Sequence, residues 1–259
     1  MLNKTLKQTR LTVGPALLGI VCLWIMTLPG LIIAQADKIY EKNNQAVVVI
    51  IIYDKDDEPI GQGSGFIVRS DGAIVTNLHV VSNAVSIKVK MAKDKYLKVE
   101  GILYSDEAND LVILKTEGND LPVLTLGNLD QIKPGEKIYV IGSPAGLENT
   151  ITDGIISGLR EVTQDQKVIQ ISAPISSGSS GGPVFNEKGE VIGVATFILE
   201  GTGIQSLNFA MPVNLIKTKI NNKEIIPLEK TIADDYTKTA EYWFWQGYYF
   251  LEQGNIKRP

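Results

Sequence analysis

Cysteine is almost absent from this 259-residue sequence, and its position matters more than its number. The one cysteine, Cys22, lies within the first 36 residues, so the rest of the chain has no disulfide and must be held together by its core. With 44% hydrophobic and 7% aromatic residues, the composition is that of an ordinary globular protein, neither disordered nor fibrous. The length allows one large or two small domains.

An excess of positive charge is also missing. Residues 1–36 carry three of the 25 basic residues and no acidic residue, which leaves 22 basic against 29 acidic residues in the rest of the chain, a net charge of −7. Such a chain has no electrostatic attraction to nucleic acid or to an anionic membrane surface. We therefore expect no nucleic-acid partner.

A charge-free run, residues 11–36, follows three basic residues and ends in Ala34-Gln35-Ala36. Basic residues, an apolar stretch and a small-x-small end are typical of a signal peptide. The run also reaches the roughly 20 residues that span a bilayer, so cleavage and retention as a membrane anchor both stay open. Either outcome places the folded part, which begins near Asp37, outside the cytosol: periplasmic or otherwise extracytoplasmic, secreted or anchored.

Short β-branched segments bounded by Gly, Asp, Asn or Lys fill the middle of the chain. They form two groups of about six strands, residues 46–54, 65–81 (turn at 70–72), 85–91, 96–105 and 110–116, then 136–143, 150–162, 167–174, 182–198 (turn near 188–189) and 206–212. Because turns and not helices separate them, we predict an all-β fold of two antiparallel six-stranded β-barrels joined near residues 117–132. A hydrophobic helix should precede the barrels, and a helix starting at Pro212 should bury Leu215, Ile216 and Ile220.

The chemistry centres on the only histidine, His79, in "VTNLHVV" at the end of a predicted strand. Asp110 opens an apolar strand in "ANDLVILK", and Ser180 lies in the glycine-rich stretch "SSGSSGGPVF". A serine hydroxyl is a poor nucleophile unless a base takes its proton and a carboxylate holds that base in one tautomer. His79, Asp110 and Ser180 are the candidates for these roles.

The same stretch matches G-x-S-x-G at Gly178, Ser180 and Gly182, the nucleophile elbow of α/β-hydrolases. In that fold the partners follow the serine, with the acid before the histidine. No histidine follows residue 79 in this chain. The order histidine, aspartate, serine, in an all-β context, favours the chymotrypsin-like arrangement instead.

Several segments together resemble trypsin-like serine proteases of the HtrA (Deg) family: "TNLHVV", "NDLVILK", "GSSGGPVFN", "SLNFAMPVNLI" and "YVIGSPAGLENTITDGIISGLRE". The resemblance covers roughly residues 40–222. It implies a double-barrel endopeptidase that cleaves polypeptides, needs no metal or cofactor, and belongs to a family in which homo-oligomers are common. It assigns Ser180 as nucleophile, His79 as general base and acid, and Asp110 as the orienting carboxylate.

The resemblance also implies where substrate binds. The backbone N–H groups of Gly178 and Ser180 would form an oxyanion hole. The family's specificity-pocket segments would fall at residues 173–177, 195–198 and 207–211, with pocket residues Ala173, Ile175, Ala195, Thr196, Phe197 and Phe209. None is charged, so the pocket should prefer small or medium aliphatic side chains. Ser179 stands where digestive relatives carry an aspartate, so activation through a freed amino terminus is not expected.

The C-terminal part departs from the family. Too few residues follow the protease domain, 37–224, for the family's usual PDZ domain. We expect a polar linker at residues 225–239 and, at 240–259, the first helix of a tetratricopeptide-like repeat, with Trp243, Gly247, Phe250 and Gly254 at the repeat's spacing. An aromatic helix that docks on a barrel or membrane is the alternative.

Two function classes remain in play. The first is an exported serine endopeptidase that cleaves unfolded or exposed protein segments. The second is a catalytically idle binding protein on the same barrels, which recruits partners through its C-terminal tail. The presence of all three candidate triad residues favours the first.

Overall fold

The first barrel occupies the N-terminal half of the folded region. The computed structural model describes residues 28–143, 149–163, 166–176, 178–201 and 204–228. Within them, the first barrel consists of β1 (Val47–Tyr53), β2 (Pro59–Arg69), β3 (Ala73–Thr76), β4 (Ser86–Met91), β5 (Lys95–Asp106) and β6 (Leu111–Thr116). Neighbouring strands are antiparallel and follow the closed order β1-β2-β3-β6-β5-β4.

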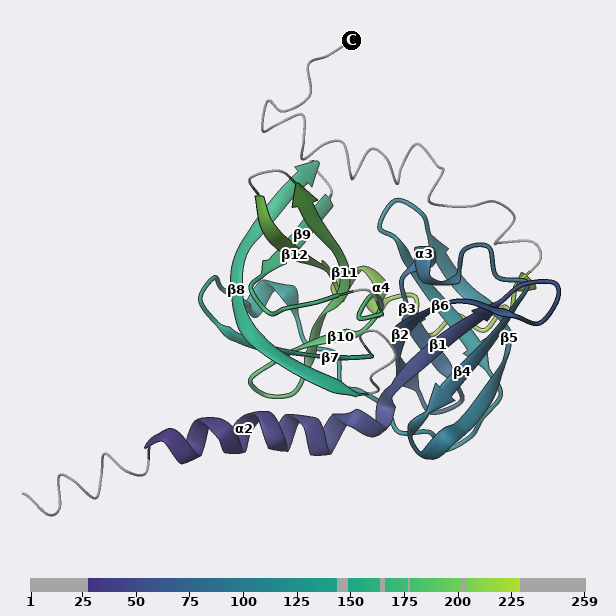
Figure 1. Ribbon diagram of the computed structural model, residues 1–259, viewed down its shortest axis with the longest axis horizontal. Coiled ribbons are helices and arrows are strands. Elements are labelled where there is room, and N and C mark those ends of the chain that lie inside the picture. The colour runs from purple at the N-terminus through teal and green to yellow at the C-terminus, as the bar shows by residue number, and fades with distance from the viewer. Residues whose placement is uncertain (1–27, 144–148, 164–165, 177, 202–203, 229–259) are drawn as a thin grey trace, which may run out of the picture.

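The second barrel repeats this plan. It consists of β7 (Lys137–Gly142), β8 (Thr150–Thr163), β9 (Gln166–Ile171), β10 (Pro183–Asn186), β11 (Val191–Gly201) and β12 (Ile204–Pro212), in the closed order β10-β11-β12-β9-β8-β7. The two barrels lie side by side (Figure 1). The predicted fold of two antiparallel six-stranded barrels is therefore confirmed, and closure leaves no sheet edge exposed for pairing with other chains.

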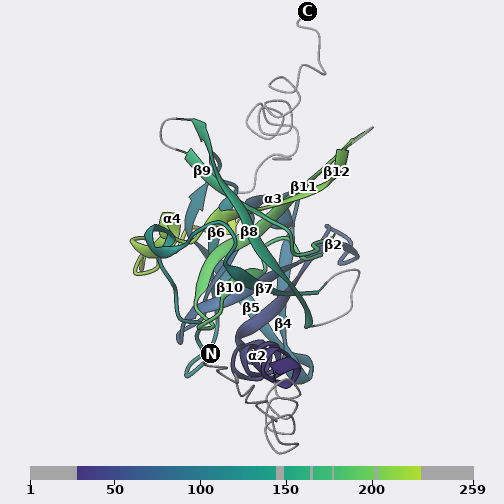
Figure 2. The same cartoon turned by 90° about the vertical axis from the view of Figure 1, so that its left-hand side faces the viewer.

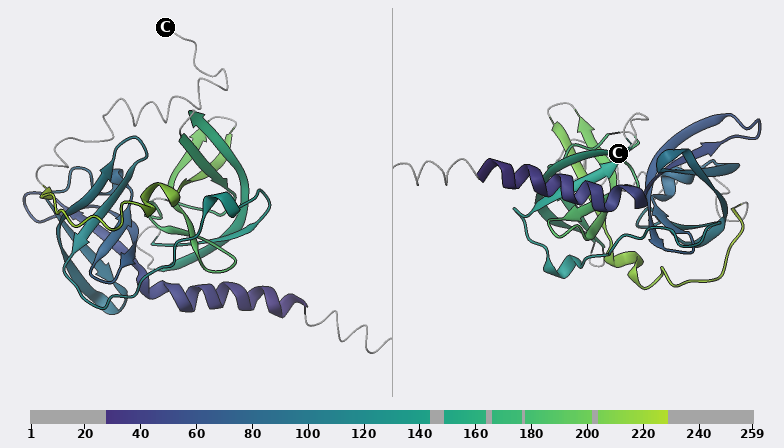
Figure 3. Two further views of the ribbon diagram at one scale, coloured as in Figure 1. Left: turned by 180° about the vertical axis from the view of Figure 1, so that it is seen from behind. Right: turned by 90° about the horizontal axis from the view of Figure 1, so that it is seen from below.

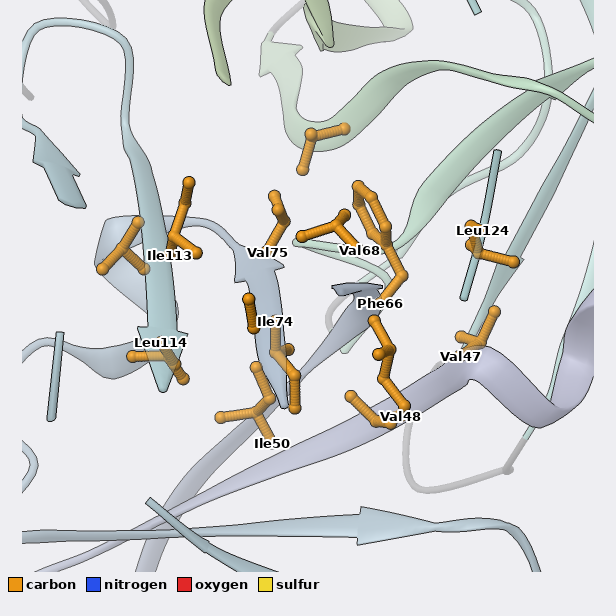
Figure 4. Close-up of a cluster of buried hydrophobic side chains, with 14 of the residues drawn as sticks. Val47, Val48, Ile50, Phe66, Val68, Ile74, Val75, Ile113, Leu114 and Leu124 are labelled. Carbon is orange, nitrogen blue, oxygen red and sulfur yellow. The ribbon is translucent and has the colours of Figure 1, made fainter. Parts of the chain in front are cut away.

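The first barrel is filled by aliphatic side chains from facing strands. Figure 4 shows side chains of β1, β2, β3 and β6 gathered together, with Leu124 of the segment that joins the barrels at their rim. Phe66, Ile74, Ile113 and Leu114 are completely buried. Burial of each such side chain is worth about 1.5–3 kcal/mol. This buried core therefore supplies the stability of a barrel that has no disulfide.

Helix α2 (Leu28–Asn43) lies along the outside of the second barrel and enters β1 through the short η1 (Asn44–Ala46) (Figures 1 and 2). Ile39 is buried in the core, and the Gln35 side chain donates a 3.0 Å hydrogen bond to the Glu187 carbonyl. The ordered helix therefore runs through Asp37, which we had predicted as the start of the folded part. Within the residues that the structure describes, no helix is long and apolar enough to cross a bilayer.

The helix predicted to start at Pro212 is shorter than expected. Pro212 is the last residue of β12, where it pairs with Gly193 of β11, and the helix α4 (Asn214–Lys217) is a single turn. The apolar pattern was nevertheless informative, because Ile216 is buried and both Leu215 and Ile220 pack against the core. Tertiary pairing of β12 thus set the boundary that local sequence had placed earlier.

After α4 the chain crosses back to the first barrel (Figure 3). Arg69 donates hydrogen bonds to the carbonyls of Ile220 and Asn222, and Ile226 forms an antiparallel bridge with Ile102 through two 2.8 Å bonds. The predicted linker at 225–239 therefore begins with residues that pair with β5 of the first barrel. The predicted repeat helix at 240–259 lies outside the described residues.

Candidate active site

His79 lies on α3 (Leu78–Val81), a single helical turn directly after β3, and not at the end of a strand as the sequence pattern had suggested. Leu78, Val80 and Val81 are buried and anchor the turn, whereas the His79 side chain is 24% exposed. The segment is also tied to the Asp110 carbonyl, which accepts the Leu78 N–H at 3.2 Å and the Asn77 side-chain amide at 2.8 Å. The only histidine is thus held rigidly at the surface of the first barrel.

Asp110 precedes β6 and turns its carboxylate toward His79. Its Oδ2 lies 2.6 Å from His79 Nδ1, and its Oδ1 accepts the His79 backbone N–H at 2.9 Å. The backbone of Asp110 has φ +52°, a left-handed conformation that Asp and Asn adopt more readily than most residues. Because the carboxylate accepts from Nδ1, it selects the tautomer whose free Nε2 can accept a proton.

Thr196 of β11 completes the support of the carboxylate. Its hydroxyl donates a 3.0 Å hydrogen bond to Asp110 Oδ2, across the boundary between the barrels. We had placed Thr196 in the specificity pocket, but its side chain is buried and engaged with Asp110. A separation of 86 residues leaves no local sequence signal for this contact.

Ser180 lies in the loop before β10, on the second barrel. Its hydroxyl donates a 3.1 Å hydrogen bond to the Thr196 carbonyl, so a rotation of the side chain is needed before its proton can pass to His79. Gly181, with φ +85°, follows it, and a Cβ there would lie 2.1 Å from the Ser64 carbonyl oxygen. Only glycine permits this close packing behind the serine.

The predicted oxyanion-hole donors lie on the same loop. Gly178 has φ +94°, again a conformation that favours glycine. In the part of the chain that the structure describes, neither the Gly178 N–H nor the Ser180 N–H donates to a protein acceptor. Both donors are therefore available for a developing negative charge on a substrate oxygen.

The environment of His79 sets its protonation. Burial alone would lower the pKa of His79, but the negative charge of Asp110 and its hydrogen bond to Nδ1 raise it, and the net pKa lies above the ordinary value of 6.5. As the candidate base, His79 therefore becomes neutral and able to accept a proton at a higher pH than an ordinary histidine.

This pKa predicts the pH profile of peptide cleavage. We expect kcat/KM to rise with pH and to level off with an apparent pKa above 6.5, because only neutral His79 can take the proton of Ser180. The measurement is initial cleavage rate of a fluorogenic peptide at low concentration from pH 5 to 9. A rise of kcat/KM with a midpoint near pH 4, which is typical of a carboxylate base, would contradict the assignment of His79 as the base.

The structure describes the surroundings of most of the six residues predicted to line the specificity pocket. Ala173, Ala195 and Phe209 are buried in the cores, and the Phe197 side chain lies outside the described part. Ile175 lines a hollow beside the nucleophile loop, formed by Val140, Gly142, Thr150, Thr152, Pro174, Ile175, Ser176 and Ser179. The composition of the pocket stays a prediction.

Metal ligands do not cluster in this region. Among the described residues, no group of three His, Cys, Asp or Glu side chains is placed to hold a metal ion. The polar groups that converge here are a histidine, a carboxylate, hydroxyls and backbone amides, a set suited to nucleophilic attack on a carbonyl.

Known proteins are similar to this chain in sequence and in architecture. Residues 63–194 match the family model described as "Trypsin-like peptidase domain". HhoB of Synechocystis sp. is 43% identical over 171 residues, which cover 62% of this chain and 40% of HhoB. A Pseudomonas fluorescens protein named "Probable periplasmic serine endoprotease DegP-like" is 40% identical over 166 residues, covering 62% of this chain and 35% of that protein.

A solved structure is similar as well. The structure titled "HtrA-type protease AlgW with tripeptide" superposes with a TM-score of 0.63 and 31% identity, covering 70% of this chain and 60% of that one. The chain spans 40% and 35% of the lengths of these two curated relatives, so the similarity concerns only a part of each.

Proposed function

This chain belongs to the trypsin-like peptidase family, and we propose that it is a serine endopeptidase that hydrolyses peptide bonds in unfolded or exposed protein segments. The observation that carries the proposal is the 2.6 Å contact between Nδ1 of His79, the only histidine of the chain, and the Asp110 carboxylate. This contact lies at the boundary between the barrels, beside the Ser180 loop of the second barrel. The relatives' names describe serine endoproteases.

The reaction begins at Ser180. After its side chain leaves the Thr196 carbonyl, Oγ attacks the substrate carbonyl carbon while His79 Nε2 takes the hydroxyl proton. Asp110 stabilises the resulting imidazolium through Nδ1–H. Negative charge on the substrate oxygen is received by the N–H groups of Gly178 and Ser180, each typically worth about 2.7–4 kcal/mol in the transition state.

The two products leave in separate steps. Imidazolium His79 gives its proton to the amine, the C–N bond breaks, and the amine departs while the acyl group stays bound to Ser180. A water molecule then gives a proton to His79 and attacks the acyl carbon. The second tetrahedral species collapses as His79 returns that proton to Ser180 Oγ, which releases the carboxylic acid and restores the enzyme.

Location and assembly form the second part of the proposal. The signal-like pattern of residues 1–36 and the name of the periplasmic relative support an extracytoplasmic protease, with the N-terminal run cleaved or kept as an anchor. Its partners are polypeptide substrates and, by analogy with the HtrA family, further copies of the chain. The predicted repeat helix at 240–259 belongs to the same proposal.

The test combines a substrate with a covalent probe. The full chain is incubated at pH 8 with reduced, carboxymethylated casein, and separately with a fluorophosphonate, followed by peptide mapping. We expect casein cleavage and a single labelled residue, Ser180, because only an activated serine reacts with the probe. Absence of both cleavage and labelling would instead support the idle binding protein. Labelling without cleavage would disprove the proposed substrate class.

A further inference from the structure

Ser64 lies on β2 of the first barrel, yet its hydrogen bonds reach the nucleophile loop of the second. The residue is completely buried. Its hydroxyl donates a 2.6 Å hydrogen bond to the Gly178 carbonyl and accepts one of 3.0 Å from the Ser143 N–H at the end of β7. Its backbone N–H donates a 2.8 Å hydrogen bond to the Ser180 carbonyl.

These contacts hold two peptide groups on either side of a third. The Gly178 carbonyl belongs to the peptide between residues 178 and 179, and the Ser180 carbonyl to the peptide between residues 180 and 181. The peptide between them carries the Ser180 N–H, one of the two proposed oxyanion donors. Because each peptide group is planar, fixing the two outer planes leaves little freedom to the one in the middle.

Backbone hydrogen bonds within the second barrel, such as the one from the Gly181 N–H to the Ala195 carbonyl, already hold part of this loop. Gly178 and Gly181 both have positive φ, and glycine backbones are the most mobile in an unsupported loop. Proposed donors at residues 178 and 180 must point at the same oxygen to be effective in catalysis. The buried 2.6 Å bond from Ser64 adds a restraint on the Gly178 carbonyl from the neighbouring barrel.

The surrounding glycines make room for this serine. A Cβ on Gly142 would lie 3.2 Å from Ser64 Oγ, and a Cβ on Gly182 would lie 3.4 Å from Ser64 Cβ. A hydroxyl can donate and accept at once, whereas alanine in this position would leave the Gly178 carbonyl and the Ser143 N–H without their partner.

We infer that Ser64 is a positioning residue for the oxyanion hole. It touches no reacting atom, but acts through Gly178 and Ser180 and joins their loop to the end of β7. The inference rests on the proposed function, since it concerns the efficiency of the same site.

The test uses Ser64→Ala in the full chain, with a fluorogenic peptide and a peptide aldehyde. We expect kcat to fall about 10- to 100-fold with KM nearly unchanged, because misplaced donors weaken transition-state binding and leave ground-state binding intact. The aldehyde, which forms a tetrahedral oxyanion on Ser180, should lose affinity by a similar factor. The pH at which kcat/KM is half-maximal should not move, since the His79 and Asp110 contacts are intact.

A matched control is Thr116→Val. It removes another completely buried hydroxyl of the first barrel, and that hydroxyl donates at 3.1 Å to the Gly72 carbonyl of the same barrel and not to the nucleophile loop. We expect a lower melting temperature in both variants but unchanged kcat and aldehyde affinity in the control. The inference is wrong if Ser64→Ala behaves like the control, or if its defect lies in KM. Inactivity of the wild-type chain would overturn the proposed function itself, and the inference with it.

Discussion

Replacement of Ser180 by alanine is expected to lower kcat for peptide cleavage by about 10⁶-fold, the loss found when a triad nucleophile is removed from other serine proteases. Without Oγ no acyl intermediate forms, and the remaining donors can only polarise a carbonyl toward attack by water. The fold should be unaffected, because the side chain makes a single hydrogen bond, to the Thr196 carbonyl. Initial rates with a fluorogenic peptide measure the effect.

The control for this variant is Ser157→Ala, which deletes an exposed hydroxyl on β8 of the same barrel. It should keep full activity. The variant Ser180→Ala should also lose fluorophosphonate labelling while keeping the wild-type melting curve. A loss of less than 100-fold in kcat would show that another residue is the nucleophile.

The variant Asp110→Asn should lower kcat by about 10⁴-fold, as the same change does in a chymotrypsin-like triad. Asparagine tolerates the left-handed backbone of this position, so the loop should stay in place. The amide oxygen of the asparagine can still accept the backbone N–H of His79, but its NH₂ group would then face Nδ1 of the His79 ring. Nδ1 would then have to accept a hydrogen bond from that NH₂ group, so the ring proton of neutral His79 would lie on Nε2. With Nε2 protonated, His79 could no longer take the proton of Ser180.

This variant separates a tautomer effect from general damage. The pKa of His79, which the Asp110 charge raises, should fall when that charge is removed, and a shift of the histidine ring resonances with pH can record this. Asp56→Asn, in the exposed turn between β1 and β2, is the control and should leave both kcat and the histidine titration unchanged. Activity within tenfold of wild type in Asp110→Asn would exclude the orienting role.

The sequence allowed the architecture to be predicted because strand signals are local. β-branched runs closed by turn residues indicated all twelve strands, and short turns between them implied antiparallel pairing. Most strand ends agree within three residues, but β2 begins six residues and β3 ends five residues earlier than predicted. The errors occurred where tertiary contacts outweigh local preference. The segment around His79 forms a helical turn because Leu78, Val80 and Val81 are buried against the barrel. The helix predicted to start at Pro212 begins only at Asn214, because Pro212 still pairs with Gly193 of β11.

In the candidate site, too, some residues could be predicted from the sequence and others could be found only in the tertiary structure. Residue types and their order along the chain singled out His79, Asp110 and Ser180, since the chain has no other histidine to act as base and the order excludes the α/β-hydrolase elbow. Sequence alone also determined the absence of a disulfide in the barrels. These conclusions depend on composition and on order, which a linear chain displays directly.

Only the tertiary structure revealed the residues that support the site. Thr196 lies 86 positions from Asp110, and Ser64 lies 114 positions from Gly178, yet each pair is joined by a hydrogen bond across the two barrels. The fold also showed that Ala173 and Ala195 are buried in a core cluster. Contacts between distant segments depend on how two closed barrels pack against each other, and no local pattern of side chains encodes that arrangement.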